Sequence, residues 1–304
     1  MIEIAEEVQD ALRGSGPVVA LETTLVAHGF PSGVGAGVAL DAERRVRRAG
    51  AVPATVGVLD GRVRVGLLER ELERFAHAGS EARKVGPRDL AACAVQRALG
   101  ATTVGGTLMI SRLAGIRFLA TGGVGGVHRG WQTQPDISAD IAELARTPAL
   151  VVSSGVKSLL DTSATAEVLE SLGIPVAGFR TNELPLFYAA AGGPPASARL
   201  ETADEAAALA AGHWRLGGRG LLVANPPVES VADLEPLIEQ GLAEARRRGV
   251  GGQAVTPFVL SFLHERSGGR TLDANRRLIA DNAGLAAEIA VAHAQLARAV
   301  GHRL

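Results

Sequence analysis

Apolar runs of strand length alternate with segments of helical periodicity along most of the chain. The runs that predict strands are Pro17–Glu22, Ala54–Leu59, Arg62–Gly66, Ile116–Ala120, Ala149–Ser153, Pro175–Phe179 and Gly220–Ala224. The segments that predict helices are Met1–Arg13, Ala36–Ala49, Leu68–Ala78, Pro87–Leu99, Ala203–Leu216, Asp233–Arg248 and Leu272–Val300. This alternation is typical of a largely parallel sheet with helices on both faces.

Two local signals refine this picture. Asp60-Gly61 lies between two apolar runs and predicts a tight hairpin, which adds an antiparallel component to the sheet. Thr256-Pro257 is interpreted as the N-cap and first residue of a further helix. Because no linker, low-complexity segment or internal repeat interrupts the pattern, we expect one α/β domain over residues 1–304. Its predicted architecture is a three-layer αβα fold around a mixed, mostly parallel central sheet.

Composition excludes several classes of protein. The chain is 47% hydrophobic and 21% charged, as in ordinary globular proteins. Its 31 basic and 32 acidic side chains give a net charge of −1, which argues against a nucleic-acid-binding surface. A single cysteine, Cys93, excludes a disulfide framework and a cysteine-ligated metal site. Since we find neither a secretory signal nor an apolar run long enough to span a membrane, we expect a soluble, cytoplasmic protein.

The basic residues are strongly biased toward arginine, because only Lys84 and Lys157 are lysines. Arginine cannot lose its proton in a protein, so it cannot serve as an amine nucleophile. The two lysines are therefore either chance surface residues or positions where an amine is needed. Lys157 directly follows a predicted buried strand and a glycine, where partial desolvation favours the neutral, nucleophilic amine.

Glu22 ends another predicted strand, where burial would raise its pKa and suit it to donate a proton. Ligands bind at the carboxyl ends of the strands in such sheets. We therefore expect Glu22, the Thr121–Gly126 loop and Lys157 to lie together. A lysine nucleophile beside a glutamic acid indicates covalent lysine chemistry on a sugar or carbonyl substrate.

A glycine-rich run, Thr121–Gly130, follows the Ile116–Ala120 strand. It is not a dinucleotide-binding fingerprint, because His128 stands where the last glycine is required, and it lacks the Lys-Ser/Thr ending of a P-loop. Two interpretations stay open: a set of tight turns, or a backbone cradle for a phosphate. His128, inside this run, is the histidine that we assign to the site.

Asp136 and Asp140 are four residues apart and share a face if a helix begins near Ser138. One interpretation is helix capping and compensation of the helix dipole. The other is a site for a hard cation, in which a carboxylate, waters and a substrate supply the oxygen ligands.

Several motifs together resemble the pseudouridine-5′-phosphate glycosidase family. They are Ala20–Thr24 (ALETT), Gly50–Thr55 (GAVPAT), Gly100–Val104 (GATTV), Ala120–Gly130 (ATGGVGGVHRG), Asp136–Asp140 (DISAD), Ser154–Asp161 (SGVKSLLD), Val223–Pro226 (VANP) and Asp281–Ala283 (DNA). The sequence ATGGVGGVHRG followed by DISAD is the most specific of them. The resemblance runs from about residue 6 to about residue 298 without a large insertion.

The resemblance implies a reaction, a cofactor and an assembly. Members of this family cleave the C–C glycosidic bond of pseudouridine 5′-phosphate reversibly to uracil and ribose 5-phosphate. They use a divalent cation such as Mn²⁺, and they resemble indigoidine synthase A in fold and form homotrimers.

The resemblance also implies residue roles. Lys157 would be the nucleophile that opens the ribose ring, Glu22 the proton donor and Asp136 the metal ligand. The implied substrate-binding residues are Lys84, Val104, Ser138, Ala139 and Asp140, with His128 and Asn282 as further site members of less defined role. The alternative is another lysine Schiff-base enzyme acting on a phosphosugar, as an aldolase does. A non-catalytic sugar-phosphate binder would not need both Lys157 and Glu22.

Overall fold

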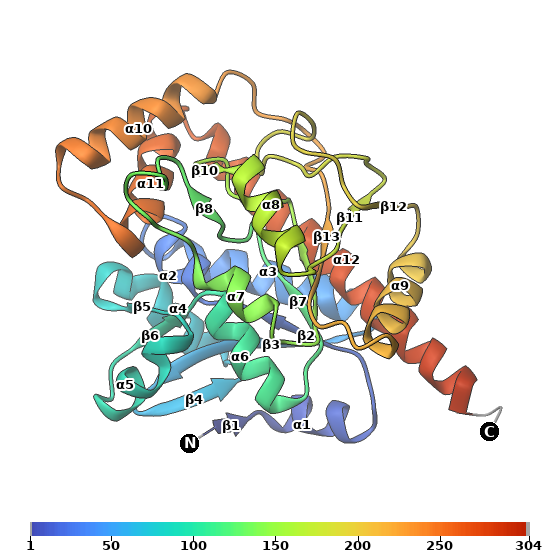
Figure 1. Cartoon of the computed structure of the whole chain (residues 1–304). Coiled ribbons are helices and arrows are strands. Elements are labelled where there is room, and N and C mark those ends of the chain that lie inside the picture. The colour runs from blue at the N-terminus through green and yellow to red at the C-terminus, as the bar shows by residue number, and fades with distance from the viewer. Residues whose placement is uncertain (1, 302–304) are drawn as a thin grey trace.

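The computed structural model describes residues 2–301 and is built around an 11-stranded mixed sheet (Figure 1). The strand order is β1-β4-β3-β2-β7-β9-β13-β11-β12, and β6 joins β3 to β5. The bounds are β1 (Ile2–Ile4), β2 (Val18–Leu21), β3 (Val52–Leu59), β4 (Arg62–Val65), β5 (Arg83–Val85), β6 (Gly100–Thr102), β7 (Phe118–Ala120), β9 (Leu150–Ser153), β11 (Val176–Phe179), β12 (Ala198–Leu200) and β13 (Leu221–Ala224). A separate antiparallel pair is formed by β8 (Val127–His128) and β10 (Leu160–Asp161). Met1 and residues 302–304 of the predicted domain lie outside the described residues.

Helices cover both faces of the sheet. They are α1 (Glu6–Arg13), α2 (Thr24–His28), α3 (Val34–Arg48), α4 (Glu69–Ala78), α5 (Leu90–Val95), α6 (Val104–Ala114), α7 (Ala139–Leu144), α8 (Thr162–Ser171), α9 (Ala203–Arg215), α10 (Glu235–Arg247), α11 (Val255–Arg266) and α12 (Arg270–Gly301), with 3-10 turns η1 (Gly79–Glu81), η2 (Pro87–Asp89) and η3 (Gly252–Ala254). In Figure 1, α6 and α7 lie in front of the sheet, and the long α12 runs behind it. The predicted αβα architecture is confirmed. Within residues 2–301, no helix is both long and apolar enough to cross a membrane.

The centre of the sheet is parallel and completely buried. Neighbours β2, β7, β9 and β13 pair in parallel, and every residue of these four strands is buried. Strands buried on both faces read as continuous apolar runs, which explains VVAL in β2 and LLVA in β13. Their carboxyl ends open at one edge, where the chain leaves the core and polar residues follow.

The predicted hairpin is confirmed. Strands β3 and β4 pair antiparallel, with Leu59 opposite Arg62. Asp60 and Gly61 both have positive φ angles, 52° and 86°. Two consecutive residues of positive φ are what a type I′ turn requires, and this is why Asp-Gly is favoured there.

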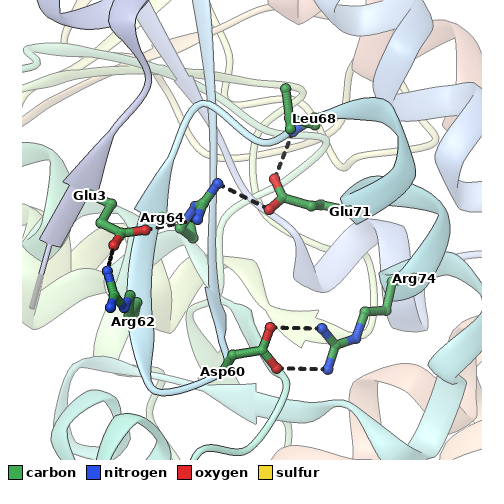
Figure 2. A network of polar contacts seen from close by, with 7 residues as sticks. All are labelled: Glu3, Asp60, Arg62, Arg64, Leu68, Glu71 and Arg74. Carbon is green, nitrogen blue, oxygen red and sulfur yellow. Dashed lines mark hydrogen bonds and ion pairs between the residues drawn. The ribbon is translucent and has the colours of Figure 1, made fainter.

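The predicted helix from Met1 is wrong at its start, because residues Ile2–Ile4 form strand β1 beside β4. Glu3 pairs with both Arg62 and Arg64 of β4, and Arg64 also reaches Glu71 of α4 at 3.1 Å (Figure 2). Strand β4 would otherwise be an edge with unpaired backbone groups. Pairing with that edge outweighs the helical pattern, so α1 begins only at Glu6.

Two further expectations need correction. The predicted helix Pro87–Leu99 is shorter, because the 3-10 turn η2 precedes α5, and α5 ends at Val95. Arg97 then adopts a left-handed φ of 53°, and the chain enters β6. Thr256 and Pro257 are the second and third residues of α11 rather than its N-cap and first residue, because that helix already begins at Val255.

Candidate active site

The carboxyl ends of the parallel strands bring the predicted residues to one cleft. Glu22 follows β2, Thr121 follows β7, and Lys157 lies four residues beyond the end of β9. All three line the same hollow, together with Lys84 of β5. The strand-end prediction is therefore confirmed in its geometry: residues far apart in sequence lie at one edge of the sheet.

The cleft has two adjoining lobes that share Glu22, Lys84 and Lys157. The larger lobe, of about 290 Å³, is lined mostly by polar and charged residues and is called the polar lobe. It is bordered by Arg88, Asp89, Thr103, Val104, Gly125, His128, Asp136, Ser138, Ala139 and Asp140. The smaller lobe, of about 50 Å³, has apolar walls formed by Leu25, Phe187, Pro257, Leu260 and Ile279. Gln253 of η3 and Thr256 of α11 complete the lining of the cleft.

Glu22 is buried and accepts a hydrogen bond from the hydroxyl of Thr121. Burial raises the pKa of Glu22, and the positive charge of Lys157 and the Thr121 hydrogen bond offset part of this rise. The predicted upward shift of the Glu22 pKa is confirmed. A carboxyl group that retains its proton closer to neutral pH can deliver it to a reacting atom.

Lys157 is held by a tight turn whose backbone depends on glycine. Gly155 has a φ of +80°, and a Cβ there would lie 1.9 Å from the carbonyl oxygen of Pro185. The hydroxyl of Ser153 donates to the carbonyl of Gly155 at 3.0 Å, and the Lys157 N–H donates to the carbonyl of Val124 at 3.3 Å. The turn therefore fixes where the lysine stem leaves the sheet.

Lys84 is the second amine of the cleft. Its Nζ donates to the carbonyl of Gln253 at 3.1 Å. Burial, with the positive charge of Lys157 as the next contribution, lowers the pKa of Lys84 to about 8. The two lysines of the chain thus lie in one site and influence each other electrostatically.

Asp140 is a buried structural link in the wall of the polar lobe. One carboxylate oxygen accepts from the N–H of Gly105 at 2.7 Å, and the other from the N–H of Gly125 at 2.9 Å. The N-cap of α7 is Ser138, whose hydroxyl accepts from the Asp140 N–H at 3.2 Å. Asp140 therefore joins the N-terminus of α6 to the glycine-rich loop, and neither aspartate is the cap of α7.

His128 and Asp136 lie side by side at the mouth of the polar lobe. The His128 N–H donates to the Asp136 carbonyl at 3.0 Å, and Nδ1 lies 4.0 Å from Asp136 Oδ2. Burial lowers the pKa of His128, although the charge of Asp136 acts in the opposite direction. The neutral imidazole is therefore favoured near pH 7.

The donor set around Asp136 fits a hard cation only if most ligands come from outside the protein. The described residues contain no group of three or more His, Cys, Asp or Glu side chains arranged to hold a metal. Asp136 supplies one carboxylate at the lobe. Mg²⁺-type cations are often held by one or two carboxylates plus waters and substrate oxygens, and this arrangement is compatible with that pattern.

The other predicted residues differ in their access to the cleft. Val104 begins α6 and borders the polar lobe, as does exposed Ala139. Asn282 is completely buried in α12, where its side-chain N–H donates to the carbonyl of Thr121 at 2.8 Å and its Oδ1 accepts from Asn225 at 3.0 Å. Asn282 therefore ties two strand-end loops together one layer behind the lining residues.

Phe187 and Gln253 are site residues that sequence reasoning missed. Gln253 lies 169 residues from Lys84, the lysine that its backbone carbonyl contacts. The sequence signal nearest to Phe187 is the aromatic pair Phe187-Tyr188 in a loop otherwise rich in Pro, Ala and Gly. Neither residue could have been placed without the tertiary fold.

Comparison with known proteins places the chain among enzymes of one family. The chain matches the family described as Indigoidine synthase A like protein over residues 7–292. It is 44% identical to the pseudouridine-5′-phosphate glycosidase of Sorangium cellulosum, with 97% of this chain and 94% of the relative covered. It is 43% identical to the enzyme of that name from Escherichia coli, with 98% and 97% covered.

Solved structures agree with this likeness. The prealnumycin C-glycosynthase AlnA, crystallised with ribulose 5-phosphate, superposes with a TM-score of 0.88 at 38% identity and covers 98% of this chain and 99% of its own. An indigoidine synthase A-like protein from Thermotoga maritima gives a TM-score of 0.86 at 38% identity, with 96% of each chain covered. Fold, site and near-complete coverage agree, and the chain belongs to the indigoidine synthase A-like family, together with the pseudouridine-5′-phosphate glycosidases.

Proposed function

We propose that this protein cleaves the C–C glycosidic bond of pseudouridine 5′-phosphate, reversibly, to uracil and ribose 5-phosphate. The observation that carries the proposal is that Glu22 and Lys157 line the same cleft at the junction of its two lobes. An acid and an amine are the two groups that cleavage of a carbon-bound base requires. The names of the relatives support the same reaction class.

Lys157 supplies the nucleophile. Its neutral Nζ bonds to C1′ of the ribose as the C1′–O4′ bond breaks. The proton that the bound nitrogen then loses is transferred to O4′, which leaves the ring open and restores the lone pair of the nitrogen. The lone pair of the bound nitrogen can then form a C=N bond at C1′ while the bond to uracil breaks. Uracil attached through carbon is a poor leaving group, and this route avoids expelling it directly from a closed sugar ring.

Glu22 supplies the proton. As the C1′–C5 bond breaks, its carboxyl group protonates C5 of the departing uracil, and the raised pKa of Glu22 keeps that proton available. Water then hydrolyses the C=N bond, which releases ribose 5-phosphate and regenerates the Lys157 amine. One water is consumed for each uracil and ribose 5-phosphate formed, so the atoms balance.

The polar lobe suits the phosphate and the sugar. Val104 opens the N-terminus of α6, where the helix dipole favours an anion, and Lys84 and Arg88 add positive charge at the same lobe. Asp136 would hold a divalent cation, with Mn²⁺ as the proposed metal, which would supply positive charge for binding substrate oxygens. Ser138, Ala139 and His128 border the same space, and Asp140 and Asn282 act by holding its walls.

Release of uracil from pseudouridine 5′-phosphate, with and without a chelator, tests the proposal directly. We expect uracil and ribose 5-phosphate in equal amounts, with the rate falling when the chelator is present. Cleavage within the sugar of a phosphosugar, with no uracil formed, would instead establish the aldolase-like alternative. We also propose, from the family resemblance, that the enzyme is a cytoplasmic homotrimer. Light scattering of the purified protein measures its oligomeric state.

A further inference from the structure

Phe187 forms a wall of the apolar lobe directly beside Lys157. A Cβ added to Gly123 would lie 2.7 Å from Cδ2 of Phe187 and 3.4 Å from Cγ of Lys157. The aromatic ring and the lysine stem therefore both pack against the same bare glycine. Phe187 is 2% exposed, and it lines the lobe that also contains Glu22.

The backbone of Phe187 is strained, and several contacts hold it in that state. Its φ is +63°, in the left-handed region that bulky residues rarely adopt. Its N–H donates to the carbonyl of Ser154 at 3.0 Å, and the adjacent Tyr188 N–H donates to the carbonyl of Leu186 at 2.7 Å. Glycine would adopt this conformation without strain. A large ring in such a position at a site suggests that the ring itself is required.

The two lobes of the cleft determine which part of the substrate contacts the ring of Phe187. The reacting carbon must lie between Glu22 and Lys157, which border both lobes. Arg88, Asp136 and the N-terminus of α6 border only the polar lobe, so the sugar phosphate belongs there and the leaving base belongs in the apolar lobe. At about 10–15 Å³ per water, a lobe of about 50 Å³ has room for roughly four waters, about the space of one small heterocycle.

We propose that Phe187 is a specificity-determining residue that binds the leaving uracil in the apolar lobe through its aromatic ring. The inference rests on the proposed function and deepens it. Aromatic side chains bind the flat, apolar face of a base well, and a sugar phosphate has no such face. Loss of the ring should therefore weaken binding of the base and leave binding of the sugar phosphate unchanged.

The reverse reaction separates the two halves of the substrate. KM for uracil and KM for ribose 5-phosphate are measured independently in wild-type protein and in Phe187→Leu, which keeps an apolar side chain on the same strained backbone. We expect KM for uracil to rise roughly 5- to 100-fold, the range that follows from losing a base–aromatic stack, and KM for ribose 5-phosphate to change less than about twofold. Inhibition of the forward reaction by free uracil should weaken to the same extent.

Tyr188→Phe is the matched control, since Tyr188 is a neighbouring aromatic residue that is 1% exposed. Its hydroxyl has no hydrogen-bond partner among residues 2–301, so the change should leave both KM values unaltered. If Phe187→Leu lowers the melting temperature sharply, Phe187→Met, which fills a similar volume without a ring, provides the same measurement.

The outcomes distinguish this inference from the proposed function. Wild-type protein that releases no uracil from pseudouridine 5′-phosphate overturns the proposed function, and with it this inference. Active wild-type protein with an unchanged KM for uracil in both Phe187 variants overturns the inference alone. So does a rise in KM confined to ribose 5-phosphate, which would place the ring beside the sugar.

Discussion

The hydroxyl of Thr121 donates a hydrogen bond to Oε1 of Glu22 inside the cleft, and both side chains are almost completely buried. The hydrogen bond stabilises the carboxylate and so opposes the effect of burial on the pKa of Glu22. Thr121 thereby sets the pH range over which Glu22 keeps its proton. The hydroxyl acts through Glu22, which makes Thr121 a positioning residue.

Replacing Thr121 by valine should move the pH profile of the reaction. Without the hydroxyl, the pKa of Glu22 rises further above 4.5, and turnover that requires protonated Glu22 falls at a higher pH than in wild-type protein. The measurement is kcat/KM for uracil release against pH. Thr147→Val is the control, because this buried hydroxyl donates to the buried carboxylate of Glu143 at 3.0 Å, away from the cleft. A profile unchanged in Thr121→Val would show that the hydrogen bond does not tune the acid.

Glu22→Gln keeps the shape of the side chain and removes its proton. We expect turnover to fall roughly 10²- to 10⁴-fold with little change in KM, the range for loss of a general acid. A rise in KM at unchanged turnover would make Glu22 a binding group instead.

The same variant should alter the pH dependence of stability. Because the folded-state pKa of Glu22 is raised, its contribution to stability is complete below pH 4.5 and is lost as pH rises through the folded-state pKa. The free energy of unfolding of Glu22→Gln should therefore increase relative to wild type between acidic and neutral pH, as measured by urea denaturation at several pH values. A constant difference would mean that the carboxyl is not desolvated in the folded protein.

Borohydride added during turnover should fix a pentose-phosphate adduct on Lys157. At pH 7, Lys84, with its pKa of about 8, is mostly protonated and should remain unmodified. Lys157→Arg should be inactive, since a guanidinium cannot deprotonate. Lys84→Arg should keep some activity, and its main effect should be a higher KM. Mass spectrometry that places the adduct on Lys84, or uracil release by Lys157→Arg at a comparable rate, would refute the assignment of the nucleophile.

Asp136→Asn should weaken binding of Mn²⁺ without destabilising the fold, because this side chain is about one-third exposed and lies 4.0 Å from Nδ1 of His128, whose neutral form is favoured. Electron paramagnetic resonance of free Mn²⁺ measures binding without relying on activity. Asp89→Asn is the matched control, since Asp89 borders the same lobe but accepts from the Gly86 N–H at 3.2 Å. Equal Mn²⁺ affinity in wild-type protein and Asp136→Asn would remove Asp136 from the metal site.

Asp140→Ala should destabilise the protein by roughly 2–5 kcal/mol, because it leaves the buried N–H groups of Gly105 and Gly125 without their acceptor. Chemical denaturation measures this loss, and Asp140→Asn, which retains one acceptor oxygen, should be less damaging. Wild-type stability in Asp140→Ala combined with a raised KM would instead assign Asp140 to direct substrate contact.

The regular parts of the fold could be predicted from sequence because burial on both faces leaves a continuous apolar run, as in β2 and β9. The three-residue strands β5 and β6 leave no such pattern, since Arg83 is exposed and Gly100–Thr102 is rich in small residues. Strand β1 was missed because a free sheet edge, not local preference, determines its conformation.

The candidate site likewise contains some residues that could be predicted from the sequence and others that could not. Glu22 and Lys157 could be placed together because parallel strands end at one edge. The role of Asp140 could not be predicted, because its hydrogen-bond partners Gly105 and Gly125 lie 35 and 15 residues away in the sequence. The left-handed backbone of Phe187 likewise depends on contacts with Ser154 that only the folded chain provides.

Both lysine side chains of the protein lie in the cleft, and this has a practical consequence for handling it. Reagents that couple to amines normally label a protein at many surface positions. Here the α-amine is the only other primary amine, so acylation of side chains would occur inside the candidate active-site cleft and should abolish the proposed activity. Attachment to a support or a dye through lysine would therefore block the site, whereas the protection that a bound phosphosugar gives against such a reagent would report its occupancy.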